Sequence, residues 1–183
     1  KSVMDPIYAT CVAFTDEEGT TVLMFGLDML NTAEKAAEDI RDRITEVIDI
    51  PRDHIVFSAT HTHSAPRGAF SGGVSQDDGY LASLVSACGA AFAAAAESLA
   101  PVDAFFGEAA VDGVASLRDV PRAESAFAMP LQTLALRCAD RDLRLVRFAC
   151  HPTVLSEDNL QYSRDLPGGA ETTPTLWLNG PCA

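Results

Sequence analysis

Three of the four histidines in this 183-residue chain stand where an apolar run gives way to small and polar residues. His61 and His63 follow Ile55–Phe57, a β-branched and aromatic run that predicts a buried strand. If the chain stays extended, these two side chains point to the same face, because side chains alternate along a strand. Two imidazoles at a strand end favour a metal site, and two polar loop residues are an equally good interpretation of a bare His-x-His.

His151 is the third candidate, because it also follows an apolar run, Leu143–Ala149, and precedes a proline. The strand ends of one sheet gather along an edge, which is where ligands bind in α/β folds. We therefore expect His61, His63 and His151 to converge. Zn²⁺ favours imidazole ligands, and a hydrolytic zinc site keeps a position for a water whose pKa falls to about 7.

Two aspartates are candidates for supporting such a site. Asp28 interrupts an apolar run, so it is either solvated at a strand end or held by a partner in the site, because an unpaired buried carboxylate is costly. Asp165 begins an Asp-Leu-Pro-Gly stretch that predicts a turn opening a helix. It either orients a metal-binding histidine or is an acid at a helix N-terminus.

The elements that must position these residues alternate between strands and amphipathic helices. Asn31 and Glu34 have the spacing of a capping box at the start of the first helix. We expect strands at 7–14, 20–27, 55–57, 104–117, 131–136, 143–149 and 173–180, and helices at 31–48 and 77–99. This pattern predicts one α/β domain over residues 1–183, with a mixed sheet, helices packed on it and the metal site at strand ends.

The composition excludes several classes of partner and site. The net charge of −13 argues against nucleic acid and against an anionic membrane surface. The alanine-rich stretch 82–96 contains serines and a glycine, so we expect a soluble helix and no transmembrane segment. The five cysteines form no Cys-x-x-Cys pair, which argues against a thiolate zinc site and for small core residues.

Several short motifs occur in an order that resembles the catalytic domain of the neutral, non-lysosomal ceramidase family, in its bacterial form. The most specific of them is Thr-His-Thr-His-Ser-x-Pro at residues 60–66. The others are Asp-Pro-Ile-Tyr-Ala at 5–9, Asp28, Cys-His-Pro-Thr at 150–153, Asp-Leu-Pro-Gly at 165–168 and Leu-Asn-Gly-Pro-Cys-Ala at 178–183. The resemblance runs over nearly the whole chain.

The resemblance implies a zinc-dependent amidase that cleaves the N-acyl bond of a sphingolipid, so that the partner is a small-molecule or lipid amide. By this resemblance His61 and His151 bind the zinc, and His63 lies beside the metal and assists binding or proton transfer. Arg118 is the nearest match to an arginine that the family places near the substrate carbonyl. The asparagine that precedes that arginine in the family is absent here, so a solvated turn residue is the other interpretation of Arg118.

Two histidines do not complete a four-coordinate zinc shell. The family completes it with a glutamate and a tyrosine farther downstream, so we expect a fragment that is incomplete at both ends, with the missing ligands beyond Ala183. Asp28 or Asp165 would otherwise have to supply them. Two further functions remain open from the sequence: a non-catalytic binding module with a degenerate metal site, and a metal-dependent esterase or phosphoesterase.

Overall fold

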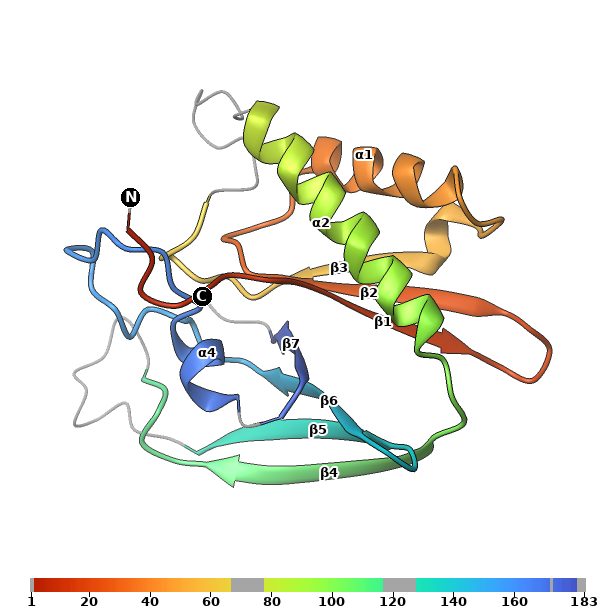
Figure 1. Ribbon diagram of the computed structural model, residues 1–183. Coiled ribbons are helices and arrows are strands. Elements are labelled where there is room, and N and C mark those ends of the chain that lie inside the picture. Colours follow the sequence, from red (N-terminus) through yellow and green to blue (C-terminus); the bar gives the residue numbers. More distant parts are fainter. Residues whose placement is uncertain (1, 67–77, 117–127, 172, 181–183) are drawn as a thin grey trace.

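Residues 2–66, 78–116, 128–171 and 173–180 are described by the computed structural model of the chain (Figure 1). In chain order the elements are β1 (Ala9–Thr15), β2 (Thr21–Leu27), α1 (Glu34–Thr45), the 3₁₀ turn η1 (Arg52–His54), β3 (Ile55–Ala59), α2 (Asp78–Glu97), β4 (Asp103–Val111), β5 (Met129–Arg137), β6 (Asp142–Phe148), α4 (Leu166–Ala170) and β7 (Thr175–Asn179).

The predicted α/β domain with mixed strand directions is confirmed, and its strands divide between two sheets. The first sheet has the order β1-β2-β3 and the second the order β4-β5-β6-β7. Hairpins make the β1–β2, β4–β5 and β5–β6 pairs antiparallel, whereas β2–β3 and β6–β7 are parallel. Among the described strands, the chain therefore passes from one sheet to the other once, between α2 and β4.

The helices α1 and α2 cover one face of the first sheet, as Figure 1 shows. Alternate residues of β2 (Leu23, Phe25 and Leu27) are at most 1% exposed and pack against these helices. Ile40 and Ile44 of α1, spaced by four residues, complete the same core. The periodicities of two and of about 3.6 residues that predicted these elements are thus the periodicities of their buried faces.

The second sheet packs against the opposite face of the first. Val12 of β1 meets Leu136, Leu145 and Leu176 of the second sheet in a separate apolar cluster. On β2, Gly26 lies directly above Leu176, since a Cβ built on this glycine would stand 3.1 Å from the Leu176 Cγ. The missing side chain lets the two sheets approach closely at this point.

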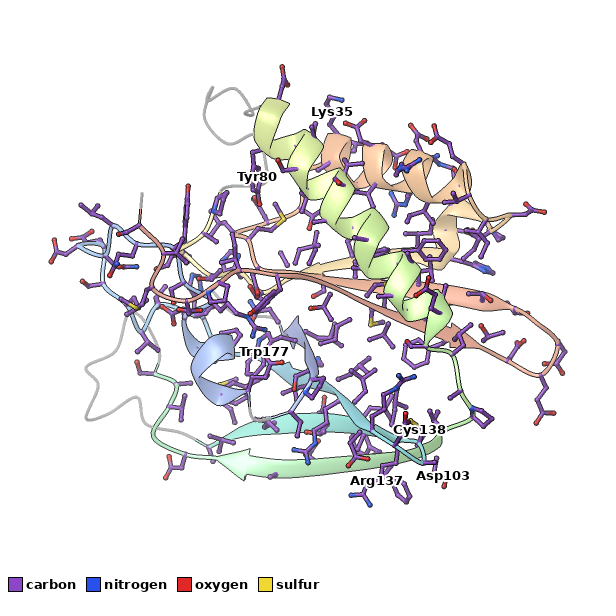
Figure 2. The ribbon with its side chains drawn as sticks, viewed as in Figure 1. Lys35, Tyr80, Asp103, Arg137, Cys138 and Trp177 are labelled. Carbon is purple, nitrogen blue, oxygen red and sulfur yellow. The ribbon has the colours of Figure 1, made fainter. Side chains whose placement is uncertain are left out.

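A third apolar cluster of the second sheet gathers around the buried residues Phe148, Cys150 and Trp177. The rings of Phe148 and Trp177 meet edge to face with centroids 6.4 Å apart, and Figure 2 places Trp177 in the interior beside α4. This cluster fixes the end of β6, from which the chain continues into His151.

One sequence prediction about the helices needs correction. The N-cap of α1 is Ala33, which makes no side-chain capping hydrogen bond, so the predicted capping box of Asn31 and Glu34 does not form. By length and composition the 20-residue helix α2 is apolar enough to cross a membrane, a test that the core helix of a soluble protein also passes, so the absence of a transmembrane segment stays a prediction. Within this fold the same helix packs through Leu81, Leu84 and Cys88 against the first sheet and α1.

Candidate metal centre

His61 follows β3 in a sharp turn. Strand pairing ends at Ala59, and the backbone of His61 has a φ of 66°, in the left-handed region that non-glycine residues rarely adopt. Two backbone hydrogen bonds hold the turn, from Thr60 N to Leu27 O (2.9 Å) and from His61 N to Met29 O (3.0 Å). The extended conformation, on which the expected alignment of the two histidines depended, is not present, because the chain leaves the strand before it reaches them.

The ring of His61 is oriented by a backbone carbonyl. Its Nδ1 lies 2.6 Å from the carbonyl oxygen of Leu30. A carbonyl oxygen accepts only, so Nδ1 carries the proton, and the Nε2 of the neutral ring keeps its lone pair. Histidines that bind metals typically donate a hydrogen bond from the ring nitrogen that does not bind the metal. That bond fixes both the tautomer and the orientation of the ring.

The rings of His63 and His151 meet although the residues are 88 positions apart. Their Nε2 atoms lie 2.8 Å apart, and the ring centroids are 4.8 Å apart. His63 follows β3 of the first sheet, and His151 follows β6 of the second. The expected gathering of strand ends thus takes place between two sheets that end at the same side of the molecule, not along the edge of one sheet.

The structure brings all three predicted histidines together. The centroid of the His61 ring lies 5.3 Å from that of His63 and 4.7 Å from that of His151. One ring nitrogen from each residue can be chosen so that all three atoms lie within 4.8 Å of one another. Nitrogen ligands about 2.0–2.1 Å from a zinc ion fall within such a spacing, so the donor set fits a divalent transition metal.

Asp28 is held by a partner, which was one of the two alternatives for this residue. Its carboxylate accepts a hydrogen bond from Tyr8 N (2.9 Å) and pairs with the Nε of Arg164 at 2.7 Å. Burial raises the pKa of Asp28, and the charge of Arg164 and the hydrogen bonds oppose that rise. Met29 and Leu30, whose carbonyls hold His61, come next in the chain, so this buried pair anchors the base of the turn.

Asp165 caps the short helix α4, as the second interpretation of this residue predicted, and it also binds the loop that follows His151. Its Oδ1 accepts from Leu166 N (2.6 Å) and from Val154 N (3.1 Å), and its Oδ2 accepts from Leu155 N (2.9 Å). Val154 and Leu155 belong to the loop that begins at His151. The role of Asp28 or Asp165 as a partner of a histidine ring stays a prediction.

Arg118, the predicted substrate-facing arginine, lies outside the described residues. The sequence did not indicate that the Leu30 carbonyl binds the His61 ring, because any residue type can supply a backbone acceptor. Sequence reasoning also missed Thr62, which is fully buried between the two histidines, and Arg164, the partner of Asp28. For Arg164 a signal existed: a buried aspartate needs a cation, and this arginine stands beside the Asp-x-Pro-Gly motif.

No protein-family model matches the sequence, and neither does any curated protein sequence. Solved structures do. The fold is similar to that of a neutral ceramidase from Pseudomonas aeruginosa, with a TM-score of 0.73 and 15% identity, over 91% of this chain and 31% of that one. It is also similar to a ceramidase complexed with C2, with a TM-score of 0.71 and 16% identity, over 91% of this chain and 30% of that one.

The chain therefore spans about a third of the length of the solved ceramidases that it resembles. At this level of identity the likeness concerns the fold. It places the three histidines in a domain whose architecture is that of part of a ceramidase.

Proposed function

We propose that this chain carries the metal-binding part of a hydrolase that cleaves an amide (N-acyl) bond with the help of zinc. The observation that carries the proposal is the meeting of His61, His63 and His151, which offer ring nitrogens within 4.8 Å of one another. The fold likeness to two ceramidases and the ordered motifs of the sequence support the same reaction class.

Each histidine has a distinct part in the proposal. His61 and His151 would hold the ion, His61 through the Nε2 that is left free of a proton by the bond from Nδ1 to Leu30. A bound zinc ion supplies an activated water and polarises the carbonyl of the scissile bond. His63 is the exposed member of the three, and its Nε2 faces that of His151 at 2.8 Å.

A hydrogen bond between two imidazole nitrogens requires that one carries a proton and the other accepts it. In this proposal the proton is on Nε2 of His63, which can pass it to a leaving amine nitrogen because the side chain of His63 reaches solvent. Arg118 would stabilise the oxyanion, as the resemblance implies. The substrate class in this proposal is a lipid or other small N-acyl amide.

The test is metal content and amide hydrolysis in a set of histidine variants. Purified full-length protein is loaded with zinc, freed of excess metal by gel filtration and assayed by elemental analysis. We expect about one zinc per chain in the wild type and in His63→Ala, and loss of the metal in His61→Ala and His151→Ala. His63→Ala should keep the metal and lose most of its activity, by about 10²–10⁴-fold if it transfers a proton.

His54→Ala is the matched control. His54 stands at the opposite end of β3 from His61, with its Nδ1 3.0 Å from the Thr21 carbonyl oxygen, and should not affect metal content. A wild-type protein that retains no zinc, or a His61→Ala variant with full amidase activity, would overturn the proposal. Matched amide and ester substrates with the same acyl chain decide between an amidase and an esterase.

A further inference from the structure

The two histidine-bearing loops contact one short segment, Ser163–Arg164–Asp165. Ser163 and Arg164 are buried, at 2% and 9% exposure. The segment follows His151 by a dozen residues and is about a hundred residues from the loop that carries His61 and His63. The metal-binding proposal assigns the ion to histidines, and none of these three residues offers an imidazole.

The backbone carbonyl and the backbone amide of Ser163 both form hydrogen bonds with the loop that carries His61 and His63. Its carbonyl oxygen accepts a hydrogen bond from the Thr62 hydroxyl (2.9 Å), and its amide donates to the Ser64 carbonyl oxygen (2.9 Å). The Thr62 hydroxyl also accepts from Ser64 N at 3.2 Å. Thr62 stands between His61 and His63 and is 0% exposed, so its position determines where both rings emerge.

Asp165 binds the second loop. Its carboxylate holds the amides of Val154 and Leu155 at 3.1 and 2.9 Å, three and four residues after His151. The backbone of Asp165 has φ 57° and ψ −133°, a region that glycine adopts with ease and other residues rarely do. Among the described residues, His61 and Asp165 are the two non-glycine positions with positive φ, so backbone strain falls on the metal site and on this segment.

Arg164 links the segment to three acidic residues elsewhere in the domain. Its side chain pairs with Asp28 at 2.7 Å and with Glu171, and its amide donates to the Asp5 carboxylate at 2.8 Å. Because Asp28 precedes the residues that hold His61, the segment also reaches the base of the first turn.

From these contacts we infer that residues 163–165 form a clasp, which sets the separation of the two histidine loops before any metal arrives. Thr62, through Ser163, and Asp165 are its positioning residues. The inference rests on the proposed function for its effect on metal binding, and it makes a separate statement about the metal-free protein: the His63 and His151 rings are near each other because of the clasp.

The first test replaces Asp165 by glycine. Glycine keeps the backbone conformation without strain and removes only the carboxylate, so the effect belongs to the side chain. We expect the zinc dissociation constant, measured by competition with a chelating dye, to rise about 10- to 100-fold while the circular dichroism spectrum is unchanged. Asp16→Gly is the matched control, since Asp16 also accepts a backbone hydrogen bond, from Thr20 N at 2.6 Å, in the distant β1–β2 turn.

The second test uses two substitutions at Thr62. Thr62→Val removes the hydroxyl and should weaken zinc binding to a similar extent, whereas Thr62→Ser keeps the hydroxyl and should restore most of the affinity. In metal-free protein, the nuclear Overhauser contact between the His63 and His151 ring protons should be lost in Asp165→Gly and Thr62→Val. It should persist in Thr62→Ser and Asp16→Gly.

These readouts separate the two proposals. If the wild type binds zinc and Asp165→Gly binds it equally well, the clasp is wrong and the proposed function stands. If the wild type binds no zinc, the proposed function fails, and the ring contact in metal-free protein still decides the clasp. A contact that survives in Asp165→Gly and Thr62→Val overturns it.

Discussion

Single residues at this site adopt conformations that an isolated peptide would avoid. A non-glycine residue with positive φ costs on the order of 1–3 kcal/mol, and it persists only where surrounding contacts enforce it. For His61 those contacts are the backbone bond to Met29 and the ring bond to Leu30. The residue types at 60–66 predicted which side chains would meet, but the geometry depends on backbone acceptors that any residue could supply.

The buried pair of Asp28 and Arg164 leads to a prediction at this scale. Their side chains are 3% and 10% exposed, so Arg164→Met should lower the free energy of unfolding by about 3–5 kcal/mol, because it leaves a buried carboxylate unpaired. Arg43→Met is the control, since Arg43 pairs with Glu46 on an exposed helix face and should cost at most about 0.5 kcal/mol. Urea denaturation of both variants measures the difference.

The same variant should show a defined pH dependence. Burial raises the pKa of Asp28, and removing Arg164 takes away the largest influence that lowers it. A group with a raised pKa in the folded state stabilises the fold below its unfolded pKa and loses that contribution as the pH rises through the folded value. The deficit of Arg164→Met relative to wild type should therefore be small in acid and grow toward neutral pH. A deficit that grows in acid would contradict this account.

At the scale of elements, the hairpins and helices could be predicted because each depends on a local period. Leu23, Phe25 and Leu27 alternate in β2, and Ile40 and Ile44 repeat in α1, whatever lies elsewhere in the chain. The division of the strands into two sheets could not be predicted in this way. It depends on Leu136, Leu145 and Leu176 packing across to Val12, contacts between residues more than a hundred positions apart.

The contact between Gly26 and Leu176 tests this packing. Gly26→Ala should cost about 1–3 kcal/mol, because its Cβ would stand 3.1 Å from a leucine that is 0% exposed. Leu176→Ala should cost about 2–5 kcal/mol through the cavity it leaves. In the double variant the added methyl group occupies part of that cavity, so the cost of the double variant should be less than the sum of the two single costs. Strict additivity in a double-mutant cycle would show that the sheets do not meet here.

At the scale of the whole molecule, a metal ion held by histidines from both sheets would couple its binding to global stability. A ligand that binds only the folded state at a hundred times its dissociation constant adds about 2.7 kcal/mol. For a chain of this size that corresponds to an increase in Tm of about 5–10 °C. We expect zinc to produce such an increase in wild type and His54→Ala, a chelator to reverse it, and His61→Ala to show none.

Calcium is the control for this measurement. The chain has a net charge of −13, and its surface carboxylates attract any divalent cation, but calcium prefers oxygen ligands over imidazole. An equal Tm increase with calcium, or with zinc in His61→Ala, would assign the effect to the acidic surface and not to the histidines.

Among the described strands, the single passage from the first sheet to the second divides the chain into two consecutive pieces. His61 and His63 belong to the piece before β4, and His151 belongs to the piece after α2. Cutting the polypeptide within residues 98–102 would thus leave His61 and His63 on one piece and His151 on the other, so neither piece alone would contain all three imidazoles. Such a split pair would hold zinc only after the pieces had reassociated, which makes this domain a natural design for a complementation reporter.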